Sequence, residues 1–144
     1  MTTSRKIDIC LTPSMLDLFD LSNKHVIVID VFRATSAMCV FLNNGGDYVI
    51  PVATVKQAEQ YKNKISPYNN NKYLVAAERS GKIVDGYDLG NSPLLYHGQK
   101  FNGSSLVITT TNGTIAIEKS KHAKHGLSLA SFLNVNSVIQ YVES

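Results

Sequence analysis

Acidic, basic and hydroxyl side chains follow three apolar segments of this sequence. The strings concerned are Asp30-Val31-Phe32-Arg33-Ala34-Thr35, Glu78-Arg79-Ser80-Gly81 and Thr109-Thr110-Thr111-Asn112-Gly113-Thr114. Asp30 and Glu78 supply carboxylate oxygens, which Mg²⁺ favours and of which it usually takes one or two from protein. Arg33 and Arg79 carry planar guanidinium groups that bind phosphate, carboxylate or sulfonate oxygens in a bidentate way. The threonines add hydroxyls, and Gly113 lets an anion approach the backbone.

Each string also has an ordinary structural explanation. Asp30 can cap a helix and pair with Arg33 on the surface, and Glu78-Arg79 can be a solvated pair. Asn112-Gly113 is a turn signal in any protein. A functional site is favoured because the three strings follow three separate predicted strands. The carboxyl ends of parallel strands meet at one edge of a sheet, where ligands bind.

Short β-branched runs alternate with segments of helical periodicity. The predicted strands are His25–Asp30, Tyr48–Val52, Tyr73–Glu78, Ser105–Thr109 and Gly126–Ala130, with Ile7–Leu11 as a further edge strand. The predicted helices are Ala34–Leu42, Val55–Lys64, Thr114–Ser120 and Val135–Val142, with a short one at Ser92–Tyr96. This alternation predicts an α/β fold: a mostly parallel sheet flanked by helices in three layers, α/β/α, in a single domain over residues 1–144. The apolar run 26–29 is typical of a central strand covered on both faces.

Other candidate motifs are weaker. The loop Asp85-Gly86-Tyr87-Asp88-Leu89-Gly90-Asn91-Ser92-Pro93 either wraps a ligand or forms turns with Asx hydrogen bonds. His122 and His125 lack a Cys, Asp or Glu at the spacing that a zinc site needs. A nucleophile elbow, a phosphate-binding loop and a dinucleotide fingerprint are all absent from the sequence.

Composition limits the class of protein. A chain of 144 residues with 44% hydrophobic content builds one core, and its formal charge of +3 is spread along the sequence, which argues against a nucleic-acid partner. The amino terminus carries Arg5, Lys6 and Asp8 instead of the apolar run of a secretory signal. Cys10 and Cys39 stand in apolar segments and are expected to be reduced core residues. We expect a cytoplasmic protein with no membrane partner.

Four strings in the same order resemble the motifs of the 2-phosphosulfolactate phosphatases. They are the strings 28–35, 78–81, 86–93 and 109–114, and the resemblance spans about Val26 to Val142. It implies a magnesium-dependent phosphatase that hydrolyses the phosphate ester of 2-phosphosulfolactate, giving sulfolactate for coenzyme M synthesis. Family members continue beyond the position of Ser144 with further strands, so the chain resembles their amino-terminal part with a shortened version of the fold.

The resemblance and the chemistry of the side chains together predict a role for each residue. The catalytic residues are Asp30, Arg33, Glu78 and Arg79, and the Mg²⁺ ligands are Asp30, Glu78 and Asp88. The substrate-binding residues are Thr35, Asn91, Ser92, Thr110, Thr111, Asn112, Gly113 and Thr114. The attacking group is expected to be water activated by the ion, with Asp30 acting covalently as the alternative.

Two other functions are compatible with the sequence. One is a non-catalytic anion-binding or regulatory domain with an incomplete site, and the other is a phosphatase for another small phosphorylated hydroxy acid. A shortened sheet with an exposed edge also favours a homo-oligomer.

Overall fold

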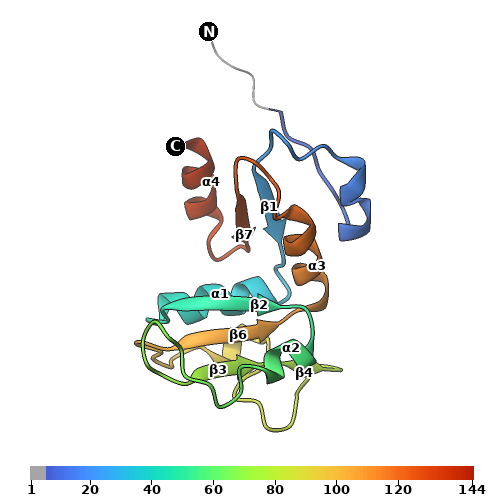
Figure 1. The fold of residues 1–144 in the computed structure, drawn as a ribbon. Coiled ribbons are helices and arrows are strands. Elements are labelled where there is room, and N and C mark those ends of the chain that lie inside the picture. The colour runs from blue at the N-terminus through green and yellow to red at the C-terminus, as the bar shows by residue number, and fades with distance from the viewer. Residues whose placement is uncertain (1–5) are drawn as a thin grey trace.

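The parallel strands of this protein form two separate sheets. The computed structural model describes residues 6–144 (Figure 1); Arg5, one of the charges in the amino-terminal stretch, lies outside the described residues. β1 (Val26–Ile29) pairs with β7 (Leu127–Ala130), and β6 (Ser105–Thr109) lies between β2 (Tyr48–Val52) and β3 (Tyr73–Ala76). All these pairings are parallel, as predicted, but the five strands do not join into one sheet.

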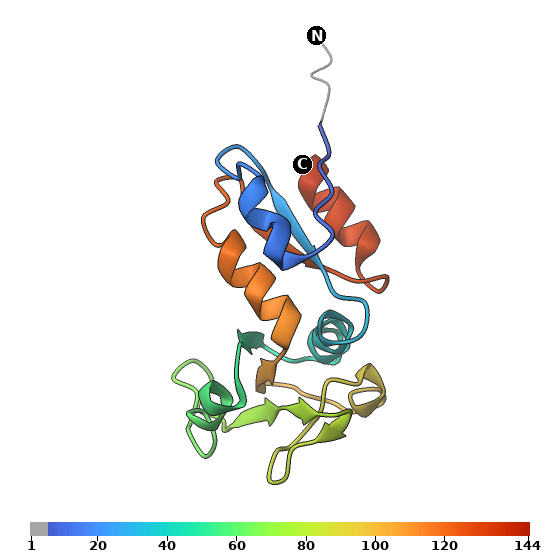
Figure 2. The ribbon, with the colours of Figure 1, turned by 90° about the vertical axis from the view of Figure 1, so that its right-hand side faces the viewer.

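One helix contacts both sheets. The helices are α1 (Ala34–Asn43), α2 (Val55–Glu59), α3 (Thr111–Ser120) and α4 (Val135–Glu143), with the 3-10 helices η1 (Pro13–Leu18) and η2 (Pro93–Leu95). α1 contacts β2 and β6 of the larger sheet and β7 of the smaller one, and Figure 2 shows it end-on between them. None of the helices in the described part of the chain has the length and apolar character needed to cross a membrane.

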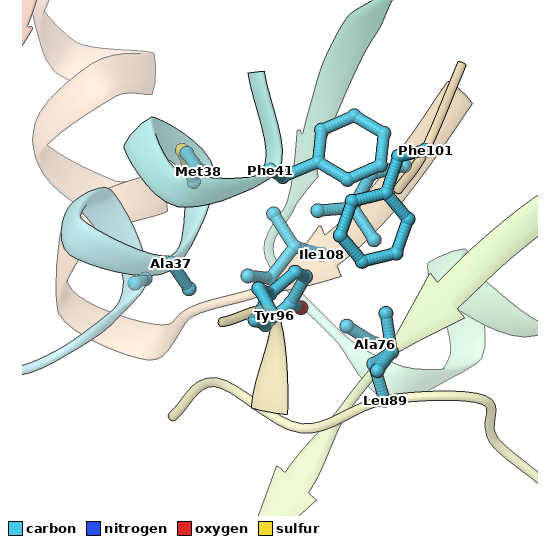
Figure 3. Packing of buried hydrophobic residues seen from close by; sticks show 10 residues of the cluster. Ala37, Met38, Phe41, Ala76, Leu89, Tyr96, Phe101 and Ile108 are labelled. Carbon is cyan, nitrogen blue, oxygen red and sulfur yellow. The ribbon is translucent and has the colours of Figure 1, made fainter. Parts of the chain in front are cut away.

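The core surrounds β6, whose five residues are all buried. Alternate residues of a strand face opposite sides. Leu106 and Ile108 therefore pack with Phe41 of α1 and with Tyr96, as Figure 3 shows in part, and Val107 packs on the other side with Ala58 of α2. Fully burying a side chain such as Phe41 contributes about 1.5–3 kcal/mol. Helices on both faces of this sheet confirm the α/β/α layering.

The smaller sheet is less covered than the sequence predicts. Ile27 and Ile29 of β1 are 40% and 69% exposed, whereas Val28 between them is buried. The prediction of a central strand covered on both faces is therefore wrong for β1. Only the face of β1 that carries Val28 is covered, and among the described residues β1 pairs with β7 alone, so it is an edge strand and not a central one.

Several boundaries differ from the predicted ones. Residues 6–11 form no strand, and α2 ends at Glu59, followed by a turn in which Asn63 has φ 61°. α3 begins at Thr111, three residues before the predicted start, so Asn112-Gly113 is helical instead of a turn. The predicted strand 73–78 divides after Ala76, and β4 (Glu78–Arg79) forms an antiparallel hairpin with β5 (Lys82–Ile83).

Both cysteines are free thiols, as predicted. They are half-buried instead of belonging to the core. Burial raises the pKa of the Cys39 thiol. This favours the uncharged form, which is typical of an unreactive cysteine.

Candidate functional site

Arg33 and Glu78 form an ion pair at the start of α1. The Arg33 guanidinium donates to Oε2 of Glu78, and Oε1 of the same carboxylate accepts the backbone N–H of Asn91 at 2.7 Å. The Glu78 side chain is 9% exposed and that of Arg33 is 39% exposed. Both oxygens of a nearly buried carboxylate therefore have partners, while the guanidinium keeps access to solvent.

Asn91 connects this ion pair with the end of β6. Its Nδ2 donates to the carbonyl oxygen of Thr109 at 2.7 Å, and its Oδ1 is buried with no hydrogen-bond partner among the described residues. The preceding residue must be small, because a Cβ at Gly90 would lie 2.6 Å from Oε1 of Glu78. The loop before η2 thus holds the carboxylate of Glu78 close to the strand end that precedes α3.

Asp30 lies beside the first turn of α3. The Thr110 hydroxyl donates to Oδ2 of Asp30 over 3.4 Å, and a Cβ at Gly113 would lie 3.4 Å from the same oxygen. Thr110 is the N-cap of α3 and makes no side-chain capping bond. A helix amino terminus carries unpaired N–H groups and a partial positive charge. Asp30 and any bound anion therefore share a favourable electrostatic environment.

A cleft of about 1070 Å³ opens at this position. One end of it is lined by Asp30, Arg33, Asn91, Thr110, Asn112 and Gly113. The other end runs along β1, between η1 and α3. The predicted strings that begin at Asp30, Glu78 and Thr109, together with the loop at Asn91, thus meet at the first end of the cleft, which we call the rim. The amino termini of α1 and α3 lie beside the rim.

The predicted three-carboxylate metal site does not form. In residues 6–144, no group of three or more His, Cys, Asp or Glu side chains is placed to hold a metal ion. Oδ2 of Asp88 instead accepts the backbone N–H of Val75 at 2.8 Å, so Asp88 supports β3. Asp30 and Glu78 remain at the rim. Of the two, Asp30 fits Mg²⁺ better, because the only described hydrogen bond to its carboxylate is the long one from Thr110, whereas Arg33 and Asn91 occupy both oxygens of Glu78.

Other predicted site residues lie away from the cleft lining. Arg79 follows Glu78 in β4, so its exposed side chain leaves the opposite face of the hairpin. Thr35 is buried within α1, and Ser92 precedes η2 without lining the cleft. The buried Thr114 donates its hydroxyl to the carbonyl oxygen of Thr110. The side chain of Thr111 lies outside the described parts of the structure.

Three residues that support the site were not predicted from the sequence. Gly90 allows the close approach of Glu78, and the buried Tyr96 donates its hydroxyl to the carbonyl oxygen of Gly90 at 2.8 Å. Ser36 donates to the carbonyl oxygen of Val31 at 2.9 Å and so holds the loop between Asp30 and Arg33. Gly90 belongs to the string 86–93, which the sequence analysis identified as a candidate motif, but no local sequence pattern indicates a role for Tyr96 or Ser36.

The geometry defines an open α/β protein whose charged rim, at the carboxyl end of β1 and beside two helix amino termini, suits a small anion. The comparison of the sequence with known protein families agrees with an anion-binding α/β protein. The chain belongs to the 2-phosphosulpholactate phosphatase family, whose sequence model matches residues 10–144.

Relatives in several bacteria are similar over most of this chain. A protein of Caldanaerobacter subterraneus subsp. tengcongensis is 42% identical over 124 residues, which are 85% of this chain and 49% of the relative. One of Thermotoga maritima is 42% identical over 121 residues, 84% of this chain and 49% of the relative. One of Clostridium novyi is 39% identical over 137 residues, 95% of this chain and 56% of the relative. Each is named probable 2-phosphosulfolactate phosphatase, and the chain spans about half the length of these relatives.

Proposed function

We propose that this chain forms the anion-binding part of a magnesium-dependent phosphatase that hydrolyses 2-phosphosulfolactate to sulfolactate and phosphate. The observation that carries the proposal is the connected network from Arg33 through Glu78 and Asn91 to the start of α3, with Asp30 on its far side. The names of the relatives support the choice of substrate. The reduced cysteines agree with a cytoplasmic location.

Each residue of the rim has a distinct task in this proposal. Arg33 binds phosphate or sulfonate oxygens with its solvent-accessible guanidinium, and Glu78 positions that guanidinium. The N–H groups in the first turn of α3 bind the anion from the other side. Asp30 would hold Mg²⁺, which supplies a Lewis acid that neutralises charge on the phosphoryl oxygens. Phosphoryl transfer depends mainly on such positioning and charge stabilisation.

Phosphate release tests the proposal. The substrates are 2-phosphosulfolactate and a panel of phosphorylated hydroxy acids, with Mg²⁺ or with a chelator. We expect metal-dependent release that falls about 10²-fold or more in Asp30→Asn, which keeps the shape of the side chain and removes its charge. The matched control is Asp85→Asn, an exposed residue outside the cleft lining. Release that persists with chelator and in Asp30→Asn would contradict the proposal.

A non-catalytic anion-binding domain is the second candidate. It is favoured by the lack of a three-ligand metal group in residues 6–144. In that case the same substrates would raise the melting temperature of the wild type but not of Arg33→Gln, and no phosphate would be released. Release from another member of the panel alone would point to a different phosphorylated acid.

A further inference from the structure

Two helices of this protein begin in the same way but are capped differently. α2 follows β2 and α3 follows β6, two strands that pair in parallel, and each helix has a threonine as its N-cap, Thr54 or Thr110. The two threonines have similar extended backbones, with φ −138° and ψ 153° at Thr54 and φ −147° and ψ 129° at Thr110. Residue type and backbone conformation therefore do not distinguish the two helix starts.

The side-chain hydrogen bonds do distinguish them. The Thr54 hydroxyl accepts the backbone N–H of Gln57 at 3.1 Å, and the Gln57 side chain accepts the backbone N–H of Thr54 at 3.1 Å, which completes a capping box. The Thr110 side chain makes no capping bond, and the third residue of α3 is Gly113, which has no side chain that could return one. α3 therefore lacks a contact that normally stabilises a helix start.

The Thr110 hydroxyl has Asp30 as its partner instead. Thr110 is 9% exposed, and its hydroxyl donates to Oδ2 of Asp30 over 3.4 Å, a length at which the bond adds little to stability. A Cβ at Gly113 would lie 3.0 Å from the Thr110 hydroxyl oxygen and 3.4 Å from Oδ2 of Asp30. Glycine at this position therefore leaves room for the contact between hydroxyl and carboxylate. Oδ1 of Asp30 has no described hydrogen-bond partner within residues 6–144.

We infer that Thr110 is a positioning residue, whose hydroxyl holds the carboxylate of Asp30 at the rim and leaves the N–H of Gly113 uncapped for the bound anion. The inference rests on the proposed function, in which Asp30 holds Mg²⁺. Carboxylates that bind metals are themselves held by hydrogen bonds, and loss of such a bond typically weakens metal binding about 10–100-fold. The sequence predicted that Thr110 binds substrate, whereas its hydroxyl acts on the ligand through Asp30.

Removal of the two hydroxyls in separate variants tests the inference. Thr110→Val and Thr54→Val each lose the hydroxyl and keep the β-branched shape. By isothermal titration calorimetry, we expect Thr110→Val to raise the dissociation constant of Mg²⁺ at least about tenfold and Thr54→Val to leave it unchanged. Without metal the order is reversed. Thr54→Val should lower the melting temperature by about 2–5 °C because it loses a capping box, whereas Thr110→Val should change it by less than about 1 °C.

Thr110→Ser supplies the rescue control. Serine keeps the hydroxyl, so the dissociation constant of Mg²⁺ should stay close to that of the wild type. A residue that only supported the structure would make Mg²⁺ binding follow the melting temperature across these variants. We expect Mg²⁺ binding to follow the presence of the hydroxyl at position 110 instead.

Three results would overturn the inference alone. The first is a wild-type dissociation constant for Mg²⁺ in Thr110→Val, and the second is weakened Mg²⁺ binding in Thr110→Ser. The third is a melting temperature of metal-free Thr110→Val that falls as far as that of Thr54→Val, which would make Thr110 an ordinary helix cap. A wild-type protein that binds no Mg²⁺ would overturn both the inference and the magnesium dependence proposed above, so the two failures are distinguishable.

Discussion

Arg33 binds Glu78 inside the protein while its guanidinium stays accessible to solvent at the cleft. Arg79, the other arginine that the sequence offered for phosphate binding, lies on the opposite face of the hairpin. The two residues have the same charge and differ in position. They therefore allow a matched test of whether position or charge alone determines anion binding.

Replacement of Arg33 by Gln should lower both activity and stability. Loss of the guanidinium is expected to reduce phosphate release about 10²-fold. It also leaves the nearly buried Glu78 carboxylate without its cation. The free energy of unfolding should fall by about 1–3 kcal/mol, less than for a fully buried pair because Arg33 is 39% exposed.

Arg79→Gln is the control for this prediction. Phosphate release and urea unfolding should both stay close to the wild type, since the substitution is on the surface. Equal losses in Arg33→Gln and Arg79→Gln would show that Arg79 reaches the substrate, as the sequence suggested.

Gly90→Ala should disturb the site without changing any charge. Its Cβ would lie 2.6 Å from Oε1 of Glu78, so the carboxylate must move away from Asn91. We expect a loss of about 1–3 kcal/mol in urea unfolding together with reduced phosphate release. Gly98→Ala meets no atom within 4 Å and has φ 73°, so it should cost about 1 kcal/mol of backbone strain and leave release intact. Similar activity in both variants would mean that the position of Glu78 is unimportant.

At the scale of elements, Tyr96 connects α1 and η2 to the loop of the site. It is fully buried against Phe41 of α1, as Figure 3 shows, and its hydroxyl donates to the carbonyl oxygen of Gly90. Burial, with a smaller contribution from Glu78, raises the pKa of the Tyr96 phenol. The neutral phenol is therefore favoured in the folded state.

This raised pKa predicts alkaline destabilisation. The unfolded chain loses the tyrosine proton near pH 10, whereas the folded protein keeps it to higher pH. The contribution of Tyr96 to stability is thus complete below about pH 10 and is lost as pH rises above it, by at most about 1.4 kcal/mol per pH unit. Denaturant unfolding between pH 8 and pH 11 should show a flatter profile for Tyr96→Phe, although that variant loses about 1 kcal/mol at pH 8 with its hydrogen bond. Parallel profiles would contradict the prediction.

The sequence predicted the presence of the elements better than their limits or partners. The runs at β2 and β6 were located correctly because β-branched residues follow turn signals there. Asn112-Gly113 was interpreted as a turn, but Thr110 acts as the N-cap and the glycine is tolerated in the first turn of α3. The prediction placed Asp88 with the metal because of its carboxylate and the resemblance; its bond to Val75 depends on a tertiary contact that no local pattern reveals.

At the scale of the whole molecule, the two sheets should differ in local stability. β6 is buried along its full length and paired on both edges, whereas β1 is paired on one edge within residues 6–144 and exposes Ile27 and Ile29. Local opening is easier where few apolar contacts must be broken. Amides of β1 are therefore expected to exchange with solvent at least about tenfold faster than those of Leu106–Ile108. Mass spectrometry of exchanged peptides measures this directly, and equal protection of both strands would show that the molecule opens only as one unit.

The packing of α1 restricts which amino-acid substitutions its buried positions tolerate. The helix begins directly after Arg33, and Ala37 and Phe41, about one and two turns further along, are completely buried against the larger sheet. A bulkier side chain at Ala37 would push the whole helix outward and carry the guanidinium with it. Under the proposed role of Arg33 in anion binding, a substitution at a buried position of α1 would therefore alter binding as well as packing, which narrows the set of small residues tolerated there.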